Sequence, residues 1–222
     1  MKESQLKVWG YDWVPDFAKG QVRDFRLRWA LIEAGLSYDV DHVAMGTQGK
    51  PEHLARQPFG QVPVLEVDGA PMFESGAIVW RIAEQSDVLL PPEVDRYAAL
   101  SWVFAALNSV EPLTGVVGTV QTFVEDREAA ERVAPTLRAM AGKKLKRLAG
   151  ALGDKDYLLG DDFCVADLMM ASVLHGLDGL ALIEEHPTLV AYRDRCLSRP
   201  AYQKAMGDQI AEIESNAAKY AR

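Results

Sequence analysis

The 222-residue chain has few of the residues that build metal centres or disulfide frameworks. It has two cysteines, Cys164 and Cys196, with no CxxC pair, and four histidines without metal-ligand spacing. We therefore expect no metal site. The HExxH, Walker A and GxGxxG motifs are also missing, so the sequence gives no support to zinc proteases, P-loop nucleotide hydrolases or dinucleotide-dependent enzymes.

Positive charge and long apolar runs are scarce as well. The net charge is −8 and the pI is near 5.1, the opposite sign to a general nucleic-acid or anionic-membrane binder. No apolar stretch reaches the roughly 18 residues of a membrane span, and the first ten residues lack the apolar region of a signal peptide. We expect a cytoplasmic protein in a reducing compartment, without nucleic-acid or membrane partners.

What remains is an ordinary globular composition with a change of character near the middle. Hydrophobic residues make up 49% and charged residues 25%, and the length permits two domains of about 100 residues each. Residues 87–95 (DVLLPPEVD) contain Pro91-Pro92, which blocks helix continuation and favours an extended linker. We therefore predict domains at 1–86 and 96–222.

The first domain mixes strand and helix patterns, whereas the second is helical throughout. The α/β elements expected in order are strand 6–10, a helix from Val22 to a Gly35 cap, strand 37–43, strands 62–67 and 70–73 joined by an Asp68-Gly69 turn, and a helix ending near Gln85. The helical stretches expected beyond the linker are 97–124 with a break at Pro112, 127–152, 164–180, 188–198 and 202–215.

The most informative stretch is 57–75 (QPFGQVPVLEVDGAPMFES). Pro63 opens a strand but cannot donate a ladder hydrogen bond, and a cis Val62-Pro63 peptide would turn the Val62 backbone outward, where an extended peptide could pair with it. Glu74-Ser75 then begins a helix whose free amides suit a carboxylate, while Glu74 suits an ammonium group. The stretch predicts a site for a zwitterionic head attached to a peptide backbone.

These residues resemble a known signature. QPFGQVPVL followed by FESGAI is similar to the glutathione-site motif of glutathione transferases of the bacterial, cytosolic type. In the second half, FCVADL at 163–168 resembles the family's capping box and hydrophobic staple, and SRPAY at 198–202 resembles its late Arg-Pro-Ala-aromatic motif. Cys164 departs from the usual Ser or Thr of that box, so about 1 kcal/mol of capping energy is expected to be missing.

The resemblance implies a thioredoxin-like N-terminal domain, an all-helical C-terminal domain and a homodimer. It implies reduced glutathione as co-substrate and a hydrophobic electrophile as second partner, a detoxifying role. Val62 and Pro63 would pair with the cysteinyl part of glutathione, and Glu74 and Ser75 would hold its γ-glutamyl head. The candidates for its glycyl carboxylate are Gln48, Lys50 and His53, although His53 also fits a surface helix position.

The residue that activates the thiol does not follow the family pattern. Counting back from Gly35 by the spacing of serine-type members reaches Gln21, and the interval from Gln5 to Leu36 contains no Ser, Thr or Cys. Tyr11 is the hydroxyl in this interval and resembles the tyrosine of other members, but the segment that follows it is longer than theirs. Arg23 is a second candidate, because a guanidinium stabilises a thiolate. The alternative for Arg23, Arg26 and Arg28 is a solvated helix face.

The first long helix after the linker helps to line the electrophile site in the family. Its candidates here are Trp102, Phe104 and Asn108. Trp102 and Phe104 are two positions apart on a helix, so they cannot both face the same pocket.

Three functions fit this sequence. The leading prediction is conjugation of the glutathione thiolate to an electrophile. Glutathione-dependent isomerisation, peroxide reduction or dehalogenation is the second, and a non-catalytic ligand carrier or scaffold on the same fold is the third. The missing Ser or Cys favours the third, whereas the intact Val62-Pro63 and Glu74-Ser75 motif opposes it.

Overall fold

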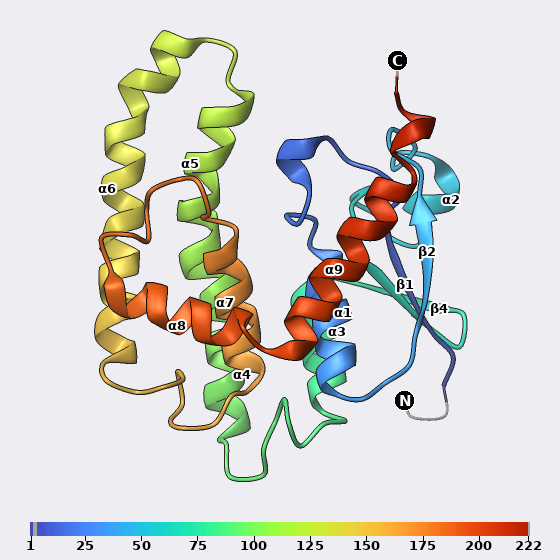
Figure 1. Cartoon of the computed structure of the whole chain (residues 1–222), viewed down its shortest axis with the longest axis horizontal. Coiled ribbons are helices and arrows are strands. Elements are labelled where there is room, and N and C mark those ends of the chain that lie inside the picture. The colour runs from blue at the N-terminus through green and yellow to red at the C-terminus, as the bar shows by residue number, and fades with distance from the viewer. Residues whose placement is uncertain (2–3, 222) are drawn as a thin grey trace. The chain divides into compact units, whose positions relative to one another are not determined.

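The computed structural model describes residues 1 and 4–221, and it divides the chain into two compact units (Figure 1). One unit combines residues 1–91 with 199–222 and contains the sheet; the other, residues 92–198, is helical. An α/β part followed by a helical part is what the sequence predicts. The domain boundaries at 86 and 96 stay a prediction, and the structure adds that the last helix belongs with the sheet-containing unit.

The sheet of the first unit has four strands in the order β2-β1-β3-β4. Strand β1 (Leu6–Tyr11) pairs in parallel with β2 (Asp39–Val43) and antiparallel with β3 (Val64–Val67), which pairs antiparallel with β4 (Ala70–Phe73). The predicted hairpin turn is present, since Asp68 and Gly69 both have positive φ, 52° and 81°. Strand β3 begins two residues later than predicted, after Pro63.

Helix α1 (Asp24–Glu33) connects β1 to β2, α2 (Pro51–Leu54) lies between β2 and β3, and α3 (Ser75–Ala83) follows β4. Helix α1 ends as predicted before Gly35. With a φ of 64°, Gly35 has the left-handed conformation that stops a helix, which glycine adopts easily because it has no Cβ atom. Helix α1 packs on strand β1 and on α3. A short 3-10 turn, η1 (Asp16–Ala18), lies in the loop between β1 and α1.

The last helix, α9 (Pro200–Ser215), packs along α1, and the 3-10 turn η3 (Ala217–Lys219) follows it. Arg199 donates two hydrogen bonds to the carboxylate of Glu33 at 2.5 and 2.8 Å, and the ring of Tyr202 meets Trp29 edge to face. Sequence pattern places α9 among the helices of the second half, but these long-range contacts hold it on the α/β unit.

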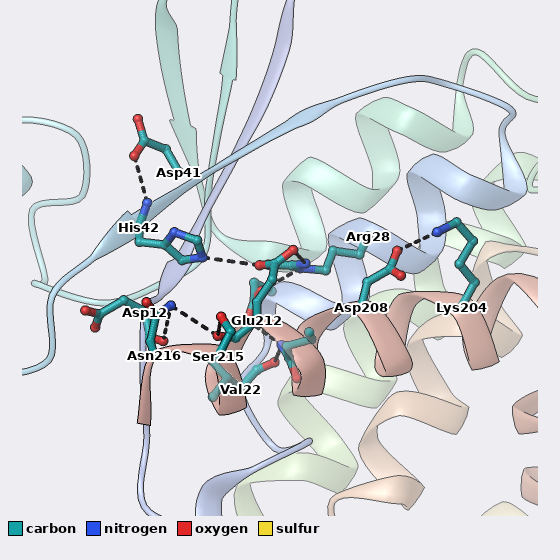
Figure 2. A network of polar contacts seen from close by, with 12 residues as sticks. Asp12, Val22, Arg28, Asp41, His42, Lys204, Asp208, Glu212, Ser215 and Asn216 are labelled. Atoms are coloured by element: carbon teal, nitrogen blue, oxygen red, sulfur yellow. Dashed lines mark hydrogen bonds and ion pairs between the residues drawn. The ribbon is translucent and has the colours of Figure 1, made fainter. Parts of the chain in front are cut away.

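The interpretation of Arg23, Arg26 and Arg28 as a solvated helix face is wrong for the two that lie within α1. Arg23 is exposed, but Arg26 and Arg28 are only 2% and 1% exposed. Arg28 donates to Asp24 at 2.8 Å and, with both terminal nitrogens, to Glu212 of α9, which also contacts His42 (Figure 2). Arg28 can be buried because the carboxylates of Asp24 and Glu212 both accept hydrogen bonds from its guanidinium.

Helices α4 (Arg96–Ala105), α5 (Glu111–Phe123), α6 (Arg127–Leu152), α7 (Val165–His175) and α8 (Pro187–Leu197) form the second unit. Helices α5 and α6 lie side by side (Figure 1), and every residue of α7 from 165 to 174 is buried, as its apolar sequence predicts. A π-helical turn, η2 (Ala106–Val110), joins α4 to α5 immediately before Pro112, where the sequence predicts a break.

The continuous run from α4 to α5 (residues 96–123) is long and apolar enough to cross a membrane by length and composition alone, a property the sequence reading did not anticipate. Core helices of soluble proteins meet the same criterion. The expectation of no membrane partner stays a prediction.

Candidate functional site

The strands bring the predicted glutathione-site residues to one end of the sheet. Since β1 and β2 are parallel, their C-terminal ends, at Tyr11 and Val43, lie side by side. Since β3 runs antiparallel to β1, its N-terminal end, just after Val62-Pro63, lies at the same end of the sheet. The C-terminal end of β4, just before Glu74, lies there too, because β4 runs antiparallel to β3. The loops that carry the candidate residues therefore meet there.

The Val62-Pro63 peptide bond is cis, as predicted. Val62 is half-buried, and within residues 1 and 4–221 no hydrogen-bond partner is found for its backbone N–H or C=O. Both groups lie directly before the first paired residue of β3, Val64. An extended peptide can pair with such a donor and acceptor as an added strand.

The second element is the N-terminus of α3. Glu74 holds the N-cap position with a φ of 71°, and no described side chain caps the helix, so the amides of the first turn are available to an anion. Ser75 is only 7% exposed, and its Oγ lies 3.4 Å from Nη1 of Arg26. A buried guanidinium therefore lies under the start of α3 and adds positive charge where a carboxylate would bind.

Arg26, buried beside Ser75, is a candidate site residue that reasoning from the sequence missed. A signal was present, because Arg26 is four positions after Val22 and three before Trp29, and such spacings share one helix face. Its charge suggested solvent instead.

The loop after β2 brings Gln48, Lys50 and His53 to the same region, and the three residues differ in how far they are buried. Lys50 occupies the N-cap position of α2, and its side chain makes no capping hydrogen bond. The residue is exposed, so its ammonium group can reach a carboxylate in solution. Gln48 is half-buried, and its Oε1 atom is buried without a hydrogen-bond partner among the described residues.

His53 is buried rather than on the surface. Its Nε2 lies 2.8 Å from the carbonyl oxygen of Gln61, the residue before Val62. Since a carbonyl only accepts hydrogen bonds, Nε2 carries the proton. This contact supports the segment that presents the Val62 backbone.

The thiol-activating candidates differ in their orientation to α1. Gly10 faces α1, because a Cβ atom built there would lie 2.7 Å from a carboxylate oxygen of Asp24. Side chains alternate along a strand, so Tyr11 projects from the opposite face, and burial raises its pKa. Gln21 and Arg23 are exposed in the turn that opens α1.

The electrophile-site candidates all belong to the second unit. Trp102 on α4 is half-buried, Phe104 is 55% exposed, and Asn108 is exposed on the π-helical turn η2. Their assignment to an electrophile pocket stays a prediction. Within the described ranges, no group of three or more His, Cys, Asp or Glu side chains is placed to hold a metal ion.

Two models of one protein family match this chain. Residues 17–84 match the family model described as glutathione S-transferase, N-terminal domain, and residues 116–200 match the C-terminal domain of the same family. Maleylacetoacetate isomerase from Rhizobium meliloti is 32% identical over 197 residues, covering 83% of this chain and 91% of that protein. Glutathione S-transferase 4 from Zea mays is 28% identical and covers 92% and 93%.

A solved glutathione S-transferase from Pseudomonas fluorescens superposes with a TM-score of 0.75 at 27% identity, over 89% of this chain and 97% of that one. The thioredoxin-like and helical fold implied by the sequence resemblance is thereby confirmed. The family-model matches and the similarity to the Rhizobium protein along nearly its whole length establish that this chain belongs to the glutathione transferase family.

Proposed function

We propose that the protein binds reduced glutathione at this end of the sheet and joins the glutathione thiolate to a small hydrophobic electrophile. The observation that carries this proposal is that two features occur together at this end of the sheet. The backbone N–H and C=O of Val62 have no hydrogen-bond partner among the described residues, and the N-terminus of α3 has no side-chain cap. A solved glutathione transferase from Burkholderia graminis, 23% identical with a TM-score of 0.77, is described with two glutathione molecules bound per subunit, which supports the ligand class.

Each part of glutathione has a counterpart in the site. The cysteinyl backbone pairs with the N–H and C=O of Val62. The γ-glutamyl carboxylate binds the first-turn amides of α3 and the Ser75 hydroxyl above Arg26, and its ammonium group binds Glu74. The glycyl carboxylate binds Lys50, with Gln48 beside it.

This placement leaves the sulfur near the N-terminus of α1. A free thiol with a pKa of about 8.5 is mostly protonated at neutral pH, so the site must favour the thiolate. The amides that open α1 and the guanidinium of Arg23 do so by electrostatic attraction, and Gln21 can donate a hydrogen bond. The thiolate then forms a sulfur–carbon bond while the leaving group departs with its electron pair, and the thiol proton has already passed to water.

The similarity to a maleylacetoacetate isomerase favours a second candidate, a glutathione-dependent isomerisation. The two reactions differ in stoichiometry. An isomerase returns glutathione unchanged, whereas conjugation consumes one thiol per turnover. Titration of free thiol during turnover therefore separates them.

The test of the binding site is the Ser75→Ala variant. We expect calorimetric titration to show glutathione binding to the unaltered protein and a Kd weaker by about 10- to 150-fold in the variant, because one hydrogen bond to a charged group is worth about 1.5–3 kcal/mol. Ser4→Ala is the matched control and should bind like the unaltered protein, because Ser4 precedes the N-terminal end of β1 and the site lies at the C-terminal end of that strand. Failure of the unaltered protein to bind glutathione would contradict the proposal.

The thiol-activating residue is tested separately. We expect Arg23→Met to raise the apparent pKa of the bound glutathione thiol by about one unit, since the nearby positive charge is lost. Tyr11→Phe should leave it unchanged, because Tyr11 projects from the sheet face opposite α1. Ultraviolet titration of the thiolate in each complex measures this shift, and a raised pKa in Tyr11→Phe alone would assign the role to Tyr11 instead.

A further inference from the structure

The loop between β1 and α1 (residues 12–23, the β1–α1 loop) carries Gln21 and Arg23 and contains one short 3-10 turn, η1. The backbone hydrogen bonds within the loop are local ones between residues 15 and 21, and they do not tie it to the rest of the protein. If it presents groups to a thiol, something else must hold it in place, since a misplacement of about 1 Å can cost 10²-fold in rate.

Helix α9 contacts the loop where it joins α1, through Gln209. This side chain is 2% exposed, and its Nε2 lies 2.9 Å from the carbonyl oxygen of Val22 and 2.5 Å from Oδ1 of Asp24. Both partners accept hydrogen bonds. Burial raises the pKa of Asp24, but its other carboxylate oxygen accepts a hydrogen bond from the charged Arg28 at 2.8 Å, which favours the ionised form. The amide nitrogen of Gln209 thus uses both of its hydrogens on the backbone and side chain that flank Arg23.

The same helix and the residues after it hold the rest of the loop. A Cβ atom built at Gly20 would lie 3.2 Å from Sδ of Met206, so the loop backbone runs against α9 there. At the start of the loop, Asn216 donates to the carbonyl oxygen of Asp12 at 3.2 Å, as Figure 2 shows. The Tyr220 hydroxyl donates to the Asp12 carboxylate at 2.7 Å, and its ring stacks on Trp13 at 4.8 Å.

These contacts span the loop from Asp12 to Asp24, and all of them lie within one compact unit. Backbone hydrogen bonds fix both ends of the loop, from Asp12 to Val43 and from the first turn of α1 to Val22 and Arg23. The C-terminal residues 206–220 add side-chain contacts at both ends and at Gly20.

We propose that helix α9 belongs to the thiol-activating apparatus and that Gln209 is a positioning residue, which fixes the β1–α1 loop so that Gln21 and Arg23 face the sulfur of glutathione. The inference rests on the proposed function. It assigns Gln209 no contact with glutathione, so it predicts an effect on the state of the thiol and little effect on affinity.

The test replaces Gln209 by methionine, which keeps the length of the side chain and removes both donors. We expect amide hydrogen exchange in residues 12–23 to accelerate by at least tenfold. The apparent pKa of the bound glutathione thiol should rise toward the free value of about 8.5, and kcat at neutral pH should fall about tenfold. KM for glutathione should stay within about threefold, since Val62 and Ser75 are untouched. Gln203→Met, the same change at an exposed position of α9, is the control.

Unchanged exchange in the β1–α1 loop would overturn the positioning role, and so would faster exchange with an unchanged thiol pKa. If Gln209→Met fails to fold, Tyr220→Phe is the second variant. It removes the half-buried hydroxyl that donates to the Asp12 carboxylate and should accelerate amide exchange at residues 12–14. Failure of the unaltered protein to bind glutathione would overturn the proposed function and this catalytic role together. The exchange measurement would still show separately whether α9 holds the loop.

Discussion

Replacing Arg28 by methionine is expected to lower the free energy of unfolding of the first unit by about 3–5 kcal/mol. The guanidinium is 1% exposed and is the positive partner of two carboxylates, Asp24 at 2.8 Å and Glu212 at 2.8 and 2.9 Å. Burial alone would lower the pKa of Arg28, but these hydrogen bonds and charges outweigh it and raise that pKa. Methionine fills similar space and leaves the buried Asp24 without its counter-charge.

Urea unfolding followed by tryptophan fluorescence measures this loss, because Trp9, Trp13, Trp29 and Trp80 all belong to the first unit. Arg23→Met is the matched control. It makes the same substitution at an exposed position of the same helix start and should change stability by about 0.5 kcal/mol or less. A loss below about 1 kcal/mol in Arg28→Met would show that the two carboxylates do not depend on the guanidinium.

The same cluster predicts how the stability of the first unit changes with pH. Partial burial would raise the pKa of Glu212, but hydrogen bonds from His42 and Arg28 lower it to about 2, from an ordinary value of 4.5. A carboxyl group whose pKa is lower in the folded state stabilises the fold above its unfolded pKa. That contribution is lost as the pH falls from 4.5 toward 2. In Arg28→Met this part of the pH dependence should be smaller.

Replacing Asp167 by alanine is expected to destabilise the helical unit by about 4 kcal/mol. Asp167 is fully buried at the start of α7 and accepts hydrogen bonds from the backbone N–H of Leu158 at 2.8 Å and of Cys164 at 3.0 Å. It also accepts from the Tyr192 hydroxyl at 2.9 Å and from Sγ of Cys164 at 3.4 Å. Burial raises the pKa of Asp167, while these donors oppose the rise. Alanine leaves them all buried and unsatisfied.

Circular dichroism follows this unfolding, because the second unit is almost entirely helical. Asp161→Ala removes an exposed carboxylate six positions earlier and should leave stability within about 0.5 kcal/mol. Equal stability of Asp167→Ala and the control would mean that water satisfies the four donors, contrary to the burial of this site.

The capping box at α7 shows what a local motif determines. The sequence predicts that Asp167 reaches back to the Cys164 amide, and it does, at 3.0 Å. The full box is present despite the cysteine, and the thiol donates to the same carboxylate, so the residue that departs from the family pattern still takes part. Tyr192, 25 positions away, was outside any local pattern.

The sequence by itself determined the order of strands and helices, the Asp68-Gly69 turn, the cis Val62-Pro63 peptide and the membership of a family. The elements, the turn and the cis peptide depend on residues close together in the chain, where φ preference, helical spacing and capping act, and the family is indicated by short motifs that can each be found locally. Tertiary structure alone decided that Arg26 and Arg28 are buried, that His53 supports Gln61, and that α9 packs on the β1–α1 loop. A charged side chain is buried only where distant residues supply its counter-charge, and the partner of Arg28, Glu212, lies 184 positions further along the chain.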